Sequence, residues 1–532
     1  MIRSICGTRG MAVAPHALAA QSALAVLREG GNALEAMVAA AATIAVVYPH
    51  MNSIGGDSFW LVHVPGEPPR GIDACGAAGG AASREWYTER GITGNIPFRG
   101  GVAANTVAGT ISGWNAAFEL SRELGGRLPL ARLLADAIHY AESGIPVTQS
   151  QAATTAARHR ELAPQPGFAA TFLPRGQVPG RGSRFTQPRM ADTLRQLARA
   201  GLDDFYRGEL GRAIAADLAA VGSPVALADL HAHRAQRRTP LALKHSLGTL
   251  YNMPPPTQGL VSLLILGILD TLDIGKVDPA SADYVHLAVE ATKQAFGIRD
   301  RYITDPAGMT VGAQSLLEAD RVRELAARID RGNAAPWGAS QGPADTVWMG
   351  VTDSAGRAVS MIQSIYHEFG SGLVLERTGI NWQNRGCSFS LDEHALNFLR
   401  PGRKPFHTLN PALAIFNDGR TMVYGSMGGD GQPQTQCAVF TRAAVFGMGP
   451  QAAISAPRWL LGRTWGQASD TLKLESRFAP EVIDTLRRYG HDVEVLDDFD
   501  ATMGHAGAIV RNPNGVLEGG ADPRSDGIVA AY

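Results

Sequence analysis

The chain changes character at the dipeptide Asp345-Thr346, and this change restricts the folds that it can adopt. Helical patterns dominate the sequence before the junction, and a segment rich in small residues, 332–345, leads up to it. Two strand-forming runs follow, 347–352 and 358–364, on either side of an Asp/Gly turn. A helical part followed by a strand-rich part is typical of sheets covered by helices, so we predict an α/β (α+β) fold.

Periodicity and turn residues predict further elements. A first helix spans 15–29 and ends at a glycine pair, and a second helix follows the capping residue Asn32. Residues 110–245 have the pattern of successive amphipathic helices. Other expected elements are helices at 281–300, 435–446 and 480–489, strands at 58–64, 373–375, 412–416 and 422–425, and a final strand pair around the turn 512–515.

The composition argues against several classes of function. Hydrophobic residues make up 45% and charged residues 18% of the 532, which predicts a large core and not a disordered chain. A formal net charge of −1 offers no attraction for nucleic acid or for an anionic membrane. The N-terminus lacks the apolar core of a signal peptide, and the apolar stretches are too short to span a membrane, so we expect a cytoplasmic protein.

The sequence gives no sign of a metal site or of a disulfide framework. Cys6, Cys75, Cys387 and Cys437 are far apart, and no Cys-x-x-Cys or Cys/His ligand spacing is present. Motifs for nucleotide phosphates, for zinc proteases and for serine hydrolases are also missing. We therefore expect no metal and no organic cofactor, so any chemistry has to come from the side chains and the backbone.

Thr346 is the first candidate catalytic residue. If the chain cut itself before this threonine, one residue would provide both a hydroxyl nucleophile and an α-amine that serves as its base. A threonine at the start of a strand is also ordinary β-propensity, so the junction by itself leaves both interpretations open.

Three later segments fit the same chemistry. Gly428-Gly429 follows a predicted strand, where two glycines let backbone N–H groups approach a developing oxyanion, although such pairs are often simple turns. Ser364 ends the strand expected to pair with the Thr346 strand and could hydrogen-bond its hydroxyl, or could be a surface serine. The polar segment 381–390 could form a substrate loop or a capped turn.

Taken together, these segments resemble the γ-glutamyltransferase (γ-glutamyl transpeptidase) family of N-terminal-nucleophile hydrolases. The resemblance covers nearly the whole chain, and its motifs occur in the family's order. They lie at 30–36, 54–57, 105–109, 253–259, 299–302, 345–346, 369–372, 425–429 and 521–525.

The resemblance implies a fold and a processing step. The family has a four-layer αββα sandwich, here with an additional helical region in the N-terminal part. Self-cleavage between Asp345 and Thr346 would produce a larger N-terminal subunit, 1–345, and a smaller C-terminal subunit, 346–532. The two fragments would remain together as one intertwined domain, and a dimer of these pairs is an option.

The resemblance also implies roles for individual residues. Thr346 would attack the substrate amide and form an acyl-enzyme that water or an acceptor amine resolves. Gly428 and Gly429 match the oxyanion-hole glycines of the family by position. Ser364 matches the hydroxyl residue that supports the nucleophile. The expected partners are a small-molecule amide substrate and the chain's own cleaved subunit, not nucleic acid or membrane.

Several positions depart from the γ-glutamyl pattern. Cys75 replaces the arginine that holds the substrate α-carboxylate, and Ser388 replaces the aspartate that pairs with the α-ammonium. His407-Thr408 replaces a serine pair, and Tyr366 replaces an asparagine. Loss of a charge-assisted pair in a desolvated pocket costs about 2–5 kcal/mol, so discrimination for a γ-glutamyl group should be largely gone.

The replacements are similar to those of a divergent branch that includes oxamate amidohydrolase and the YwrD-like proteins. Arg385 and His407, with Arg99, would suit a small carboxylate-bearing amide that has no α-ammonium group. The full set of expected substrate-binding residues is Arg385, His407, Thr408, Ser388, Tyr366 and Arg99. We predict an autoprocessed threonine amidohydrolase for a small acidic amide such as oxamate. The alternatives are γ-glutamyl hydrolysis or transfer, as on glutathione, a cephalosporin-type acylase, and a non-catalytic binding relative.

Overall fold

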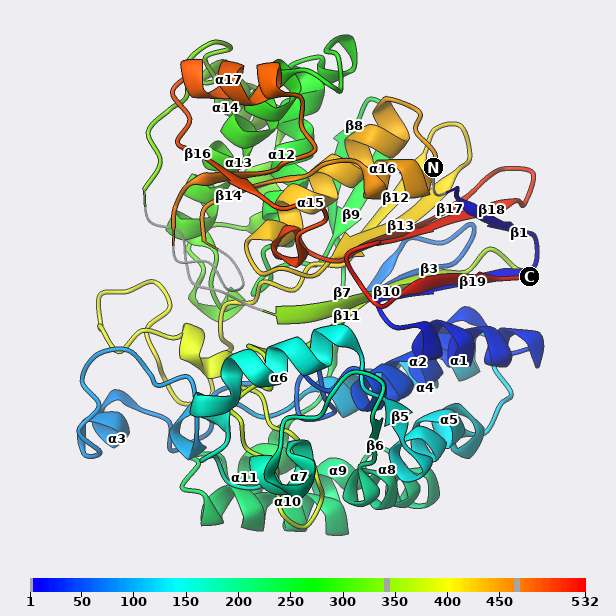
Figure 1. Ribbon diagram of the computed structural model, residues 1–532, viewed down its shortest axis with the longest axis vertical. Helices are drawn as coiled ribbons and strands as arrows, with labels where there is room; N and C mark the ends of the chain where they lie inside the picture. The colour runs from blue at the N-terminus through cyan, green and yellow to red at the C-terminus, as the bar shows by residue number, and fades with distance from the viewer. Residues whose placement is uncertain (1–2, 339–344, 464–468) are drawn as a thin grey trace.

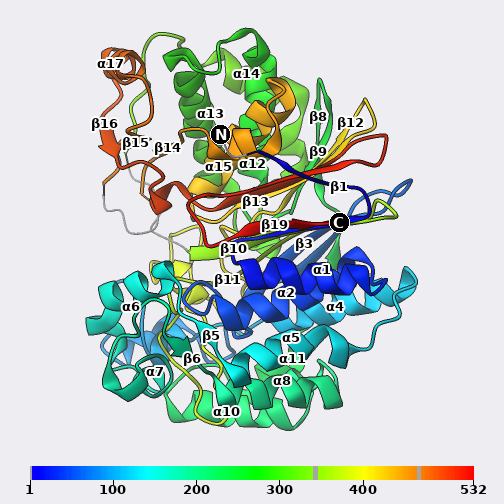
Figure 2. The same cartoon turned by 45° about the vertical axis from the view of Figure 1, so that its right-hand side comes forward.

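The computed structural model describes residues 3–338, 345–463 and 469–532. Within these residues two seven-stranded sheets lie face to face, and helices cover the outer face of each sheet (Figure 1). This arrangement confirms the four-layer αββα sandwich predicted from the sequence. Further helices pack beneath one outer layer and form the additional helical region expected in the N-terminal part (Figure 2).

The first sheet contains the strand that begins at the Asp345-Thr346 junction. Its antiparallel order is β19 (Ile528–Ala531), β2 (Gly10–Ala14), β10 (Asp345–Asp353), β11 (Ala358–Tyr366), β3 (Asp57–His63), β4 (Arg70–Ala74) and β7 (Gln236–Arg238). This one sheet contains strands from both sides of the junction, and β10 and β11 lie between β2 and β3. A cut before Thr346 would therefore leave two fragments that share hydrogen-bonded strands.

The second sheet faces the first across a core of apolar side chains. Its order is β1 (Ile5–Gly7), β18 (Leu517–Ala521), β17 (Ala506–Arg511), β13 (Thr421–Ser426), β12 (Ala412–Phe416), β9 (Gly248–Asn252) and β8 (Leu241–His245). The indole of Trp348 fills the space between the sheets. A Cβ atom at Gly425 or Gly507 would lie 2.1 or 2.3 Å from this ring, so only glycine fits at these two positions.

Helices cover the outer faces of both sheets. On the first sheet lie α1 (Ala17–Arg28), α2 (Ala33–Val47) and α4 (Thr110–Glu123). On the second lie α12 (Gly259–Thr271), α15 (Gly431–Phe440) and the short α16 (Pro450–Ser455), and α13 (Ala282–Tyr302) packs against α12 and α15. All of α2 is buried, because it is covered by the sheet on one side and by further helices on the other. It begins with a capping box in which Asn32 accepts from the Glu35 N–H at 3.0 Å and Glu35 accepts from the Asn32 N–H at 2.9 Å.

The remaining elements extend this frame. The additional helical region contains α5 (Leu130–Ser143), α6 (Gln149–Leu162), α7 (Phe168–Phe172), α8 (Pro188–Ala200), α9 (Asp204–Arg207), α10 (Glu209–Ala220) and α11 (Leu227–Ala232). The other named elements are α3 (Arg84–Thr88), α14 (Ala319–Ala327), α17 (Pro480–Arg488), the β5/β6 pair (Ile145–Pro146, Arg184–Phe185) and a small sheet of β14 (Trp459–Leu461), β15 (Leu472–Glu475) and β16 (Val493–Leu496). No helix in the described part of the chain combines the length and the apolar composition that crossing a membrane requires.

One predicted strand is wrong and one predicted helix has different bounds. The segment 373–375 is a loop with a single bridge between Val374 and Asn381. The segment contains leucines because the loop is buried. A short apolar run has the same appearance in a buried loop and in a paired strand, so the sequence alone does not distinguish them. The helix expected at 435–446 starts earlier, as α15, and continues into a π-helical turn over Thr441–Val445.

Candidate active site

Thr346 lies buried in the first sheet, beside the strand that carries Ser364. The Thr346 hydroxyl donates to Ser364 Oγ at 3.2 Å, and Ser364 Oγ also accepts from the Tyr366 N–H at 2.9 Å. The ladder between β10 and β11 is irregular here, because its register shifts between Asp345 and Val347. Such an irregularity changes the direction of a side chain, so the shift places the two hydroxyls together at the junction.

The loop that contains Gly428 and Gly429 connects β13 to α15. Both glycines have positive φ, +118° and +53°, which other residues adopt only with strain. Ser426 Oγ donates to the Met427 carbonyl at 2.8 Å, and the Gly431 N–H donates to the Gly428 carbonyl at 2.7 Å. In a trans peptide the N–H points away from the preceding carbonyl. These contacts therefore direct the Gly428 and Gly429 N–H groups to the opposite side of the loop.

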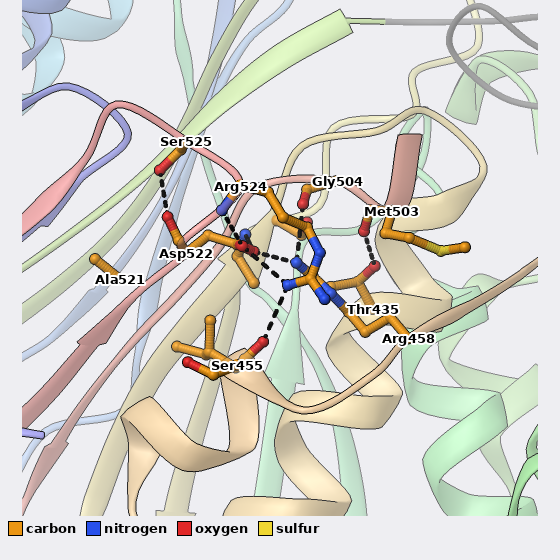
Figure 3. Close-up of polar contacts among 12 residues, drawn as sticks. Thr435, Ser455, Arg458, Met503, Gly504, Ala521, Asp522, Arg524 and Ser525 are labelled. Atoms are coloured by element: carbon orange, nitrogen blue, oxygen red, sulfur yellow. Dashed lines mark hydrogen bonds and ion pairs between the residues drawn. The ribbon is translucent and has the colours of Figure 1, made fainter. Parts of the chain in front are cut away.

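A buried cluster of charges, shown in Figure 3, holds Gly504, a residue that contacts this loop. A Cβ atom at Gly428 would lie 3.5 Å from Cα of Gly504, so the two segments are in contact. Arg458 donates to the Gly504 carbonyl at 3.0 Å and also pairs with Asp522. Arg524 pairs with the same carboxylate at 3.1 Å. Because each of these charges is paired, the cluster can hold the loop without leaving an isolated buried ion.

Gln258 connects the glycine loop to the predicted substrate residues. Its Nε2 donates to the Gly429 carbonyl at 2.8 Å and to the Thr408 carbonyl at 2.9 Å, and the side chain is fully buried. Gln258 lies in the 253–259 motif, which marks the family resemblance in the sequence but gave no reason to assign this side chain a role. The two residues that it contacts are 150 and 171 positions away in the sequence, so the contacts form only in the folded chain.

Arg385 is a buried cation that stacks on Tyr366, the residue opposite Asp345 in the β10/β11 ladder. Its guanidinium lies 3.7 Å above the ring of Tyr366 and donates to Thr408 Oγ1 at 3.2 Å and to the Phe406 carbonyl at 3.4 Å. Tyr366 has φ of +80°, a strained value for an aromatic residue, and this turn places its ring under the guanidinium. No carboxylate in the described ranges forms an ion pair with Arg385. A buried guanidinium in this state is suited to an anionic ligand.

Asp57 and His407 form a second buried pair beside Arg385. Asp57 Oδ2 and His407 Nε2 are 3.0 Å apart. Burial raises the pKa of the Asp57 carboxyl to about 7, although backbone N–H donors and the Arg385 charge act in the opposite direction. Burial, together with the charges of Arg385 and Lys404, holds the pKa of His407 well below its usual range. His407 is therefore neutral, and its contact with Asp57 is a hydrogen bond.

The other predicted residues lie in different places. Ser388 and Tyr366 line a cavity of about 600 Å³, and Ser388 Oγ donates to the Phe406 carbonyl at 3.3 Å. Arg99 donates to the Glu368 carbonyl at 2.7 Å and pairs with Glu161 at 2.7 Å, so its head group is already engaged. Arg99, Arg385, His407 and Thr408 are not among the residues that line this cavity. The backbone of Asp345 is part of β10, and residues 339–344 of the predicted linker lie outside the described residues.

Two buried groups have the residue types of a metal site. Asp57, Cys75 and His407 place their ligand atoms within 4.8 Å of one another, but the adjacent Arg385 charge would repel a cation. The second group is His286, Glu290 and His491. There the two histidines hydrogen-bond each other at 2.8 Å, and the carboxylate pairs with Lys293 at 2.7 Å. Hydrogen bonding accounts for both groups.

Comparison with known proteins gives one consistent result. Residues 19–532 match the family model for gamma-glutamyltranspeptidase. The chain is 62% identical to the oxamate amidohydrolase proenzyme of Klebsiella pneumoniae and 41% identical to the glutathione hydrolase-like YwrD proenzyme of Bacillus subtilis, with 100% and 99% of both chains covered. The crystal structure of cephalosporin acylase from Bacillus halodurans aligns with a TM-score of 0.91 at 34% identity, over 100% of this chain and 97% of that one.

These matches agree with the fold and with the ordered motifs of the sequence. The family model covers the Asp345-Thr346 junction, the Gly428-Gly429 loop and every strand of both sheets except β1 and β2 near the N-terminus. The relatives named as proenzymes align over their whole lengths, so no separate domain accounts for the likeness. The chain belongs to the γ-glutamyltranspeptidase family of enzymes, as the sequence predicts.

Proposed function

We propose that the chain is a self-processed threonine amidohydrolase that acts on a small amide carrying a carboxylate, with oxamate as the first candidate. The observation that carries this proposal is the buried guanidinium of Arg385, which donates to a hydroxyl and a carbonyl but has no ion-pair partner among the described residues. A substrate carboxylate would supply that partner. The relative with 62% identity is named for the hydrolysis of such an amide.

Processing would use the same threonine as catalysis. Thr346 Oγ1 attacks the Asp345 carbonyl carbon, the peptide C–N bond breaks, and the nitrogen takes a proton to become an α-amine. Water then hydrolyses the resulting ester and releases the Asp345 carboxylate and the Thr346 hydroxyl. The contact with Ser364 Oγ at 3.2 Å supports this proposal, because it fixes the direction of the attacking hydroxyl. The products are the fragments 1–345 and 346–532.

In the processed enzyme the free α-amine takes the proton of the Thr346 hydroxyl as Oγ1 attacks the substrate amide. The N–H groups of Gly428 and Gly429 stabilise the negative charge that develops on the carbonyl oxygen. The C–N bond breaks and ammonia leaves with the transferred proton, which produces an acyl-enzyme. Water attacks this ester and releases the dicarboxylate. In this proposal Arg385, Thr408 and Tyr366 hold the carboxylate end of the substrate, and Ser388 forms part of the cavity wall.

The departures from the γ-glutamyl pattern support a small acyl group. Cys75 stands where the family resemblance places an arginine, and its side chain is buried and uncharged because burial raises the pKa of its thiol well above the usual value. It cannot hold an α-carboxylate. We therefore expect γ-glutamyl substrates to be poor ones, and we propose hydrolysis and not transfer as the main reaction. The cytoplasm is the proposed location.

Intact mass and a substrate panel test the proposal. Wild-type protein should convert to two fragments, whereas Thr346→Ala should remain one species near 56.2 kDa, and the control Thr346→Ser should still cleave because it keeps a hydroxyl. Processed wild type should release ammonia from oxamate faster than it cleaves glutathione, a glutaryl anilide or a γ-glutamyl anilide. A Thr346→Ala chain that still splits or still hydrolyses amides would contradict the mechanism, and faster turnover of γ-glutamyl anilide would contradict the substrate.

A further inference from the structure

Asp57 gathers donors from four separate segments around the candidate site. Its Oδ1 accepts from the Gly76 and Gly109 N–H groups at 3.0 Å each and from Gln383 Nε2 at 3.2 Å, while its Oδ2 faces His407 Nε2. Asp57 starts β3 and lies directly opposite Ser364 in β11. The carboxylate therefore joins the strand that carries Ser364 to the segments of Arg385 and His407.

This arrangement decides which nitrogen of His407 carries the proton. With Oδ1 occupied by three donors, an ionised Asp57 accepts at Oδ2, so the neutral imidazole holds its hydrogen on Nε2. Nδ1 is then an acceptor. This atom is buried and has no hydrogen-bond partner among the described residues. A buried acceptor without a donor is costly, so this nitrogen is suited to accept a hydrogen bond from a bound molecule.

Arg385 has a buried donor that lacks a hydrogen-bond partner in the described part of the chain. This donor is the Nε–H group, and the charge of Arg385 is close enough to lower the pKa of His407. The Arg385 guanidinium contacts Phe406 and Thr408, the residues on either side of His407. One cationic donor and one neutral acceptor of this site therefore have no partner among the described residues. A molecule with a carboxylate and an amide N–H on adjacent carbons would satisfy both groups at once.

We propose that Asp57 is a positioning residue that makes the site specific for amides: it fixes His407 with Nδ1 as an acceptor for the N–H of a carboxylated amide whose carboxylate binds Arg385. This inference rests on the proposed function and deepens it. It assigns the leaving-group side of the substrate to His407, while Thr346 and the glycine loop act on the carbonyl. His407 transfers no proton in this scheme, and it only accepts the hydrogen bond.

Oxamate and monoethyl oxalate separate this role from a structural one. Both substrates form the same oxalyl-enzyme, one with loss of ammonia and the other with loss of ethanol, so only acylation differs between them. The ester has no N–H to donate to Nδ1. The ratio of kcat/KM for amide over ester therefore reports the His407 contact and is independent of deacylation.

Asp57→Asn is the main variant. The asparagine can keep its Oδ1 contacts, but its amide faces His407 as a donor and forces the imidazole hydrogen onto Nδ1. We expect the amide-to-ester ratio to fall by about 10- to 100-fold, the loss expected when a buried hydrogen bond is replaced by two opposed donors. Nitrogen-15 NMR of the histidines should show the change of tautomer. His407→Ala should lower the ratio similarly, and the double variant should add nothing further.

Asp73→Asn provides the matched control. Asp73 is a buried carboxylate on β4 that contacts Lys404 and the Cys75 N–H and does not touch His407, so its loss should leave the ratio unchanged. Equal losses on amide and ester in Asp57→Asn and His407→Ala would overturn the inference, because both rates would then report structure alone. If processed wild type turned over neither substrate, the proposed function would fail, and the inference with it.

Discussion

Replacing Arg385 with methionine should change activity and stability in different ways. The guanidinium is buried, has no ion-pair partner in the described part of the chain, and is held only by Thr408, by the Phe406 carbonyl and by the face of Tyr366. A charge-assisted pair with a substrate carboxylate in such a place contributes about 2–5 kcal/mol, which corresponds to a fall of about 30- to 5,000-fold in kcat/KM for oxamate.

Stability should not fall in parallel. Burial lowers the pKa of Arg385, because the buried surroundings disfavour the charged form. Desolvation of a charge costs several kcal/mol. This cost equals or exceeds the stabilisation that two long hydrogen bonds and one cation–π contact contribute. We expect the free energy of unfolding of Arg385→Met to stay the same or to rise.

The assay compares oxamate with oxamide, in which a second amide replaces the carboxylate. Arg385→Met should lower kcat/KM for oxamate much more than for oxamide, and urea unfolding should give the stability. Arg99→Met is the matched control, because Arg99 is paired with Glu161 and with backbone carbonyls. It should lose stability and keep the substrate ratio. An equal loss on both amides in Arg385→Met, with a fall of several kcal/mol in unfolding free energy, would refute the reasoning.

Two further predictions follow from the same site. Gln258→Leu keeps the volume of the side chain but removes the hydrogen bond to the Gly429 carbonyl. We expect kcat to fall by about 10- to 100-fold with little change in KM, because the proposed oxyanion contact acts in the transition state. A rise in KM alone in steady-state assays would argue against this role. The pKa of Asp57 is raised to about 7, and protonation would turn its Oδ2 into a donor and move the His407 hydrogen to Nδ1. The ratio of kcat/KM for amide over ester should therefore fall as the pH drops below about 7. The charges of Arg385 and Lys404 affect the amide and the ester rates alike, so they do not change this ratio. A ratio that stays constant between pH 5.5 and 9 would contradict the prediction.

Local sequence was sufficient for much of the frame. The limits of β12 and the start of α2 were predictable, because strand alternation, turn residues and an N-cap act over a few neighbouring residues. The same is true of the glycine pair after β13. The segment 373–375 was mispredicted as a strand because burial of a loop leaves the same apolar signal as strand pairing.

The candidate site was only partly predictable. The sequence placed Thr346 and Ser364 on neighbouring strands, and their hydroxyls lie 3.2 Å apart. It also singled out Arg385 and His407 as cationic or donor groups, but it treated Arg99 in the same way. The structure distinguishes the two arginines, because Arg99 forms an ion pair with Glu161 and Arg385 forms none with a carboxylate among the described residues. Whether a charge is already paired depends on segments far away in the chain.

The sequence by itself determined the family and, through that resemblance, the four-layer fold, because these depend on ordered motifs; it also predicted a self-cleavage junction before Thr346. Only the tertiary structure brought Asp57 to His407, which is 350 residues away, and Gln258 to the glycine loop. An aspartate at the start of a strand and a glutamine before a helix are unremarkable in a linear sequence. Their roles come from hydrogen bonds, which act over about 3 Å and form only after the two sheets have packed together.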